Sequence, residues 1–348
     1  MTRRIVVFVA LTFILALHAG GQVPTPQEHL AQYDLQFGET FTPYDRILDY
    51  FDALAKASPL ITVEKIGSTY EGRPLVLATL TSQKNRANLD GIRRNVALLA
   101  NGEGDVAQLA RTTPAIVWLA FGVHGNESSS AEAAMLVAST LLREPRLLDD
   151  LVIIIDPLEN PDGRERYIQW FRRTMGVKPN PDPDTFEHTE PWPGGRFNHY
   201  LFDMNRDWTW MSQRETQARV AAYKLWSPQV FVDFHEMSHQ SSYFFPPDAK
   251  PINANVPRSA EDWLDVFGRA NAAEFSRRGW AFFVAERFDL FYPGYGDSWP
   301  SLRGAIGMTY EVAGGGRAGV AVERNDGTIL RLADRVQRHF TAAMTTVR

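Results

Sequence analysis

Short buried-type strands alternate with helical patterns along most of this chain, and that alternation restricts the possible folds more than any other feature. The strand candidates are short, mostly apolar runs at residues 115–121, 151–156, 230–235 and 305–312. Helical patterns follow them at residues 128–142, 213–225, 260–278 and 329–346. Strands and helices in this order predict a three-layer α/β/α sandwich around a mixed, largely parallel central sheet.

The N-terminal part of the pattern adds one helix and one hairpin. Apolar residues recur at helical spacing over residues 44–56, and two strands are expected within residues 61–81. Residues 157–198 are rich in Pro, Gly and Asn, so we expect a long irregular segment there. A loop of that length inside a compact domain is usually functional.

One domain over residues 22–348 accounts for the chain most simply. A chain of 348 residues with 44% hydrophobic content can bury a full core, and it shows no internal repeat. Its 36 basic and 41 acidic residues are mixed along the sequence and give a net charge of −5. Nothing in this charge pattern indicates a nucleic-acid partner.

Residues 1–21 have the features of an export signal. Thr2-Arg3-Arg4 precedes an apolar run from Ile5 to Leu17, and the small residues Ala19-Gly20-Gly21 follow it. The run is shorter than the roughly 20 apolar residues that a membrane-spanning helix needs. We therefore expect a secreted or periplasmic protein with no membrane anchor after signal removal.

The absence of cysteine limits the chemistry that the chain can perform. With no Cys, disulfides, a cysteine nucleophile and thiolate metal ligands are all excluded. Any protein-bound metal must therefore use histidine and carboxylate ligands.

Three such residues stand next to predicted strands. His124 and Glu127 are three apart just after one strand, and His235 ends another. Open α/β sheets place their sites at such strand ends. Two imidazoles and a carboxylate would hold zinc and leave a position open for water. His239, in a polar turn, is a rival ligand.

These residues also have purely structural interpretations. His124 alone could be bonded to a loop carbonyl, and Glu127 is an acidic residue of the kind favoured in the first turn of a helix. The addition of His235, on a separate buried strand, favours convergence of all three on one cleft.

Five short motifs occur in a fixed order along about 250 residues. They are His124-Gly125-Asn126-Glu127, Asn160-Pro161-Asp162-Gly163, Asp203-Met204-Asn205-Arg206, Asp233-Phe234-His235 and Thr309-Tyr310-Glu311. In this order they resemble the zinc metallocarboxypeptidase family typified by carboxypeptidases A, B and T. The ordered set is far more specific than any one motif.

The resemblance implies one zinc ion and a peptide substrate with a free C-terminus. The implied zinc ligands are His124, Glu127 and His235. Asp203 would orient the ring of His124. Asn205 and Arg206 would bind the substrate's terminal carboxylate, a task suited to the two-pronged guanidinium.

The resemblance also assigns the groups that act on the scissile bond. Glu311 matches the glutamate that takes a proton from zinc-bound water and passes it to the leaving amine. Arg172 matches the arginine that polarises the scissile carbonyl, with Arg173 as a close rival. Tyr292 and Tyr295 are candidates for the family's mobile tyrosine, and Tyr292 is preferred.

The preference for a C-terminal side chain is less constrained. Asp297 lies in the neighbourhood that forms the floor of the family's side-chain pocket, where an acidic residue accompanies preference for Lys or Arg. Its alternative is a turn residue that bonds its own backbone amides. The chain departs from the best-known members after the third ligand, where it has Glu236-Met237-Ser238-His239. Subsite preferences therefore cannot be copied from them.

Two other functions fit the same platform. A zinc amidase would act on amino-acid conjugates or cell-wall peptides, and a catalytically inactive secreted binding module would keep only the fold. The inactive module is disfavoured because the chain keeps all three ligands and the base. We therefore expect a secreted zinc metallocarboxypeptidase.

Overall fold

The computed structural model describes residues 22–348, so the expected export signal at residues 1–21 lies outside the described part. Its centre is a seven-stranded sheet with strand order β1-β2-β4-β3-β5-β7-β6. These strands are β1 (Ile61–Ser68), β2 (Pro74–Leu80), β3 (Ala115–Phe121), β4 (Leu151–Asp156), β5 (Val230–Ser238), β6 (Tyr243–Phe244) and β7 (Ile306–Gly314). β4, β3, β5 and β7 pair in parallel, whereas the pairings of β1, β2 and β6 are antiparallel.

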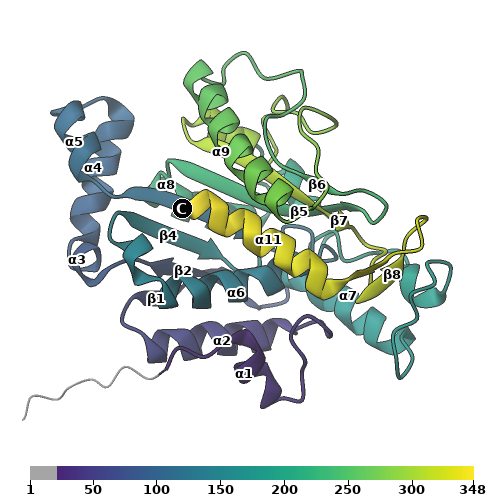
Figure 1. The fold of residues 1–348 in the computed structure, drawn as a ribbon. Coiled ribbons are helices and arrows are strands. Elements are labelled where there is room, and N and C mark those ends of the chain that lie inside the picture. The colour runs from purple at the N-terminus through teal and green to yellow at the C-terminus, as the bar shows by residue number, and fades with distance from the viewer. Residues whose placement is uncertain (1–21) are drawn as a thin grey trace, which may run out of the picture.

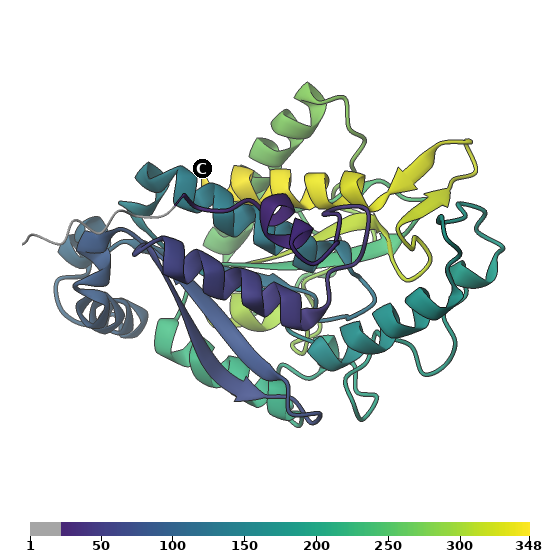
Figure 2. The same ribbon diagram turned by 90° about the horizontal axis from the view of Figure 1, so that it is seen from below.

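Helices cover both faces of this sheet (Figure 1). One face packs against α2 (Tyr44–Ala57), α6 (Ser129–Arg143), α9 (Arg258–Arg277) and α11 (Leu332–Val347). The other packs against α4 (Leu89–Asn101), α8 (Arg214–Trp226) and α10 (Ser298–Leu302). Figure 2 shows the layers from the side, with α11 above the sheet and α8 below it. The predicted three-layer α/β/α sandwich is confirmed.

The remaining elements lie around this sandwich. They include α1 (Pro26–Ala31), α3 (Gln83–Arg86), α5 (Val106–Thr112), α7 (Pro161–Thr174), and the hairpin of β8 (Ala321–Glu323) and β9 (Ile329–Arg331). Residues 329–331 were predicted as the start of the last helix. Because they pair with β8 instead, α11 begins only at Leu332.

The predicted irregular segment at residues 157–198 is wrong in its first part, where α7 forms. Asn160 caps this helix, since its side-chain Oδ1 accepts a hydrogen bond from the Gly163 amide at 2.9 Å. Pro161 stands in the first turn, where its fixed φ suits a helix and its missing N–H costs nothing. Asn-Pro-Asp-Gly is therefore a helix start here, although the same residues favour turns.

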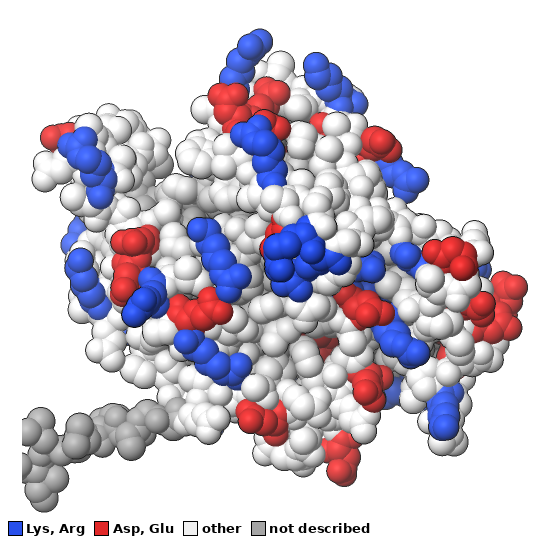
Figure 3. All heavy atoms as spheres, in the orientation of Figure 1, with Lys and Arg blue, Asp and Glu red and all other residues white. Residues whose placement is uncertain are grey.

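The surface shows no broad charge asymmetry on the face seen in Figure 3, where acidic and basic side chains are interspersed. Within residues 22–348, no helix combines the length and apolar character needed to cross a bilayer.

Candidate metal centre and substrate cleft

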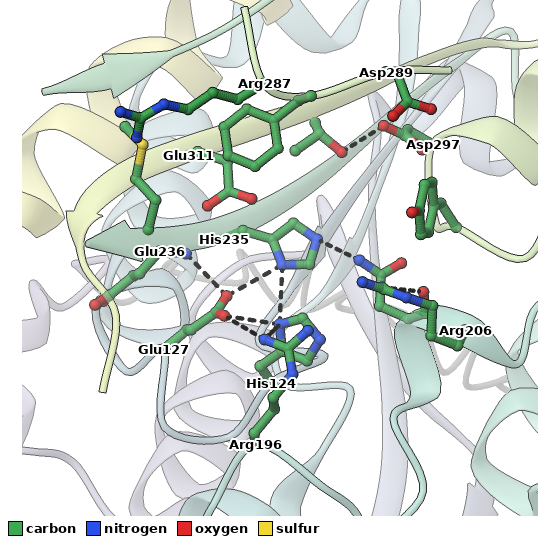
Figure 4. Close-up of a pocket in the computed structure, with 15 residues that line it drawn as sticks. His124, Glu127, Arg196, Arg206, His235, Glu236, Arg287, Asp289, Asp297 and Glu311 are labelled. Carbon is green, nitrogen blue, oxygen red and sulfur yellow. Dashed lines mark hydrogen bonds and ion pairs between the residues drawn. The ribbon is translucent and has the colours of Figure 1, made fainter. Parts of the chain in front are cut away.

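The three predicted ligands meet where β3 and β5 end (Figure 4). His124 lies in the turn after β3, which a hydrogen bond from the Glu127 amide to the His124 carbonyl closes at 3.1 Å. Glu127 Oε1 is 2.8 Å from His124 Nδ1, and Glu127 Oε2 is 3.1 Å from His235 Nδ1. All three residues are buried. They form a compact cluster of two imidazoles and one carboxylate.

This cluster fits a zinc ion. Two ligands of a tetrahedral zinc lie roughly 3.4 Å apart when each bond is about 2.1 Å long. The two imidazole Nδ1 atoms are 3.3 Å apart, and both lie about as far from Glu127. Three protein ligands leave a fourth position open, which is the arrangement of catalytic rather than structural zinc sites.

A carboxylate lies behind each imidazole. Asp203 Oδ1 is 3.1 Å from His124 Nε2, in the position that the motif order predicts. Asp233 Oδ2 is 2.8 Å from His235 Nε2, a contact that the motif order did not predict. Partners of this kind fix the tautomer and the orientation of metal-binding histidines.

Glu311 lies beside the cluster on β7, directly opposite His235 in the register of β5 and β7. Its side chain is buried and lines the cleft. Burial raises the pKa of Glu311 to about 8. The Glu127 carboxylate adds to this rise, whereas His235 opposes it. A carboxylate whose pKa lies near neutrality suits proton transfer.

The cleft has a volume of about 360 Å³ and contains the three ligands and Glu311. Asn205 and Arg206 line it as well, at the end of a short 3₁₀ turn, Met204–Arg206. The Asn205 Oδ1 atom accepts a hydrogen bond from the Gly296 amide at 2.7 Å, which holds its side chain in place. Arg206 is exposed, with its guanidinium 4.5 Å from the ring centre of Tyr295. No carboxylate among residues 22–348 forms an ion pair with Arg206, so its charge is available to a ligand.

A family model described as zinc carboxypeptidase matches residues 47–279, more than half of the chain. The chain belongs to the zinc carboxypeptidase family. The matched region contains all three ligands together with Asn205 and Arg206, but it ends before Glu311.

Solved structures support the fold of this family member. A metallo-carboxypeptidase from Burkholderia cenocepacia superposes with a TM-score of 0.59 at 16% identity, covering 88% of this chain and 69% of that one. Carboxypeptidase A from Helicoverpa armigera superposes with a TM-score of 0.57 at 16% identity, covering 89% and 72%.

Sequence relatives match a smaller part of the chain. Carboxypeptidase 2 from Trichophyton rubrum is 25% identical over 126 residues, which cover 35% of this chain and 18% of the relative. A probable carboxypeptidase 2 from Arthroderma benhamiae matches 19% of its own length at the same identity. The chain thus spans about a fifth of the length of these curated relatives.

The structure does not support the assignment of Arg172 as the carbonyl-polarising residue of this zinc carboxypeptidase. Arg172 does not line the cleft, and its Nη2 donates to the Phe41 carbonyl at 3.4 Å. The rival Arg173 bonds the Gln169 carbonyl on its own helix. Residues 161–174 form a continuous helix, which carries Arg172 about 16 Å along the axis from Pro161. The first turn of α7 lies next to the turn after β3, so its last turn is far from the metal cluster.

Arg196 occupies the cleft instead. Its Nε and Nη2 donate to Asp203 Oδ2 at 3.1 and 2.9 Å, and its Nη1 lies 3.3 Å from Glu127 Oε1. Arg196 follows α7 in the irregular part of the segment that was expected to be functional. That expectation was the only sequence signal for it, because no motif contains Arg196.

The aromatic assignments also change. Tyr292 lies outside the cleft, where its hydroxyl donates to the Arg206 carbonyl at 3.2 Å and accepts from Trp210 Nε1 at 2.9 Å. Tyr295, the other candidate, lines the cleft. Tyr292 therefore supports the backbone of Arg206, and the preference for it as the mobile tyrosine is not supported.

Asp297 lines the cleft, but both of its oxygens have partners. Oδ1 accepts from the Ser298 amide, and Oδ2 accepts from the Thr309 hydroxyl at 2.7 Å. Burial raises the pKa of Asp297. These contacts favour the turn interpretation of Asp297 over a free acidic group.

Glu236 and the rival ligand His239 both have other partners. Glu236 Oε2 forms a buried ion pair with Arg335 Nη1 at 2.8 Å, and its Oε1 accepts from the Ser129 amide. His239 is bonded to Gln240 and is not part of the ligand cluster. Glu236 is therefore unsuited to act as the base, and His239 is not a ligand.

Proposed function

We propose that this chain is a zinc-dependent carboxypeptidase that hydrolyses the C-terminal peptide bond of peptide substrates. One observation carries the proposal: the ligand cluster, the carboxylate of Glu311 and the guanidinium of Arg206, which forms no ion pair within residues 22–348, line the same cleft. The first two are needed for metal-assisted hydrolysis, and the third suits a free α-carboxylate.

The residues at the metal would divide the chemistry among them. When bound by His124, Glu127 and His235, zinc would lower the pKa of a coordinated water and polarise the scissile carbonyl. Glu311 would accept a proton from the attacking water and deliver it to the leaving amine nitrogen.

Arg196 would take the role that the motif order gave to Arg172. Its Nη1 lies 3.3 Å from Glu127 Oε1 at the edge of the ligand cluster, and from there it would donate to the oxygen of the scissile carbonyl. A donor aimed at the charge that develops on this oxygen stabilises the transition state. Asp203 holds the other side of the guanidinium.

Asn205 and Arg206 would bind the terminal carboxylate of the substrate. Tyr295 stacks on the Arg206 guanidinium and limits its motion. An ion pair between Asp297 and a basic substrate side chain stays a prediction, and it would require Asp297 to exchange its contact with Thr309.

Comparison of free and amidated peptides tests the proposal. The parent enzyme should release the C-terminal residue of a free peptide and leave its amidated counterpart nearly intact. Arg206→Ala should reduce this discrimination, since deleting one partner of such a charge pair costs on the order of 2–5 kcal/mol. Equal rates on both peptides in the parent would contradict exopeptidase action.

The same assay, extended to peptidoglycan fragments and N-acylated amino acids, separates the peptidase from a zinc amidase. The presence of every ligand and of Glu311 in one cleft does not favour an inactive binding module. Secretion or periplasmic location stays a prediction from residues 1–21, as does the count of one zinc ion per chain.

A further inference from the structure

His235 has a carboxylate partner on its own strand. Asp233 is two residues before it on β5, and strand residues two apart face the same side of a sheet. Asp233 is fully buried, and its Oδ2 lies 2.8 Å from His235 Nε2. Within residues 22–348, neither oxygen of Asp233 forms a hydrogen bond, so its contact with His235 is a short charged contact.

The proton on His235 is placed by the atoms around its ring. Its Nδ1 faces the Glu127 carboxylate and the other imidazole, so a metal would bind at Nδ1. A neutral imidazole that binds metal through Nδ1 carries its proton on Nε2. This N–H needs an acceptor, because an unpaired buried donor is costly.

Asp233 is the acceptor within reach of that N–H. The other neighbour of Nε2 is the Asn205 amide nitrogen at 3.3 Å, which is a donor. Its orientation is set by the hydrogen bond from the Gly296 amide to Asn205 Oδ1. Asn205 therefore cannot accept the proton of His235.

The neighbouring loop leaves room for the Asp233 carboxylate. A Cβ atom at Gly296 would lie 2.1 Å from Asp233 Oδ2, so a larger residue there would displace the carboxylate. Asp233 Oδ2 therefore lies close against the backbone of Gly296.

We propose that Asp233 is a positioning residue of the metal site, which holds the His235 proton on Nε2 and keeps Nδ1 directed at the metal. Asp203 gives His124 the same kind of support, so each imidazole has its own carboxylate. The proposal rests on the zinc site of the proposed function. It assigns to Asp233 an effect on metal affinity that does not depend on turnover.

The proposed role of Asp233 is tested by the zinc affinity of the full chain. This affinity is measured by competition with a chromophoric chelator. Asp233→Asn should bind zinc roughly 10–100-fold more weakly than the parent, since loss of such partners typically has that effect. Asp156→Asn is the matched control. Asp156 is also buried and is paired with Arg219 Nε at 3.1 Å, but it is not a partner of His235. Its zinc affinity should stay near that of the parent.

Cobalt substitution adds a spectroscopic readout. The visible spectrum of the Co²⁺ form reports ligand geometry, so it should change in Asp233→Asn and not in Asp156→Asn. Parent-like zinc affinity and an unchanged spectrum in Asp233→Asn would overturn the proposal. Equal weakening in both variants would overturn it too, because the effect would then follow from any lost buried charge.

A second variant keeps the test decisive if Asp233→Asn does not fold. Gly296→Ala retains the charge of Asp233 but displaces its carboxylate, so zinc binding should weaken in the same direction. Parent-like affinity in Gly296→Ala would then overturn the proposal. A parent that binds no zinc would contradict the proposed function as well, whereas tight binding by parent and variants alike contradicts this inference alone.

Discussion

Glu127 and Glu311 are two buried carboxylates in one cleft, and their surroundings give them different chemistry. Burial opposes ionisation of Glu127, but contacts with His124 and His235 hold the pKa of Glu127 well below its usual range. Glu311 has no comparable partner, and burial raises its pKa to about 8. Paired groups whose pKa values are pushed apart divide naturally into a fixed ligand and a proton-transfer group.

Replacing Glu311 should therefore separate zinc binding from turnover. Glu311→Gln should keep the fold and the metal but lower kcat by about 10²–10⁴-fold, because an amide cannot accept the proton of the attacking water. Steady-state kinetics together with metal analysis check this. Near-normal kcat in a zinc-loaded variant would show that another group is the base.

The proposal that Arg196, and not Arg172, polarises the scissile carbonyl is also testable at the residue scale. Arg196→Ala should lower kcat by about 10²–10³-fold, the typical loss for one donor to a developing oxyanion. Arg172→Ala is the matched control, since Arg172 lies outside the cleft and should keep the parent rate. A large loss in Arg172→Ala with little loss in Arg196→Ala would restore the assignment implied by the motif order.

At the scale of elements, a buried ion pair ties together the helices around the site. Glu132 on α6 pairs with Arg164 on α7 at 2.7 Å, and both oxygens of Glu132 also accept from Thr42, two residues before α2 begins. Both charged side chains are fully buried. Because α6 starts just after Glu127, this pair fixes the position of a metal ligand as well as the packing.

Breaking this pair should destabilise the fold strongly. Glu132→Gln removes the negative charge and replaces one acceptor oxygen by an NH₂ group, which would face the N–H and O–H donors of Thr42 and Arg164. The free energy of unfolding should therefore fall by roughly 3–5 kcal/mol. Urea unfolding followed by circular dichroism measures the change. Glu274→Gln is the control, because Glu274 pairs with Arg277 on the exposed surface of α9 and should unfold like the parent. A Glu132→Gln midpoint equal to that of the control would contradict the structural role.

At the scale of the whole molecule, metal binding and stability are linked. The ligands come from β5 and from the turn between β3 and α6, so an ion that binds all three stabilises only the folded chain. A ligand at 100 times its Kd adds about 2.7 kcal/mol to folding. Chelation should therefore abolish activity and lower the Tm, and added zinc should restore both.

The control for this experiment is a chain that cannot bind the ion. His235→Ala should have a Tm that responds neither to chelator nor to zinc. A parent Tm that is likewise insensitive, with activity retained in chelator, would exclude a zinc-dependent enzyme.

The sequence alone determined the features that depend on local pattern. The predicted strands at residues 115–121 and 151–156 match β3 and β4, because buried parallel strands are uniformly apolar and bounded by turn residues. The parallel order of the strands then brings His124, Glu127 and His235 to one edge of the sheet. Polar residues at the ends of apolar runs made these ligands predictable.

Only the tertiary structure decided which other side chains reach this edge. The motif order gave Arg172 a role, but the length and direction of α7 carry it away from the site. Arg196 has no periodic pattern or motif around it, and its loop is placed by contacts distant in sequence. Such contacts depend on how separate elements pack, which local sequence patterns do not encode.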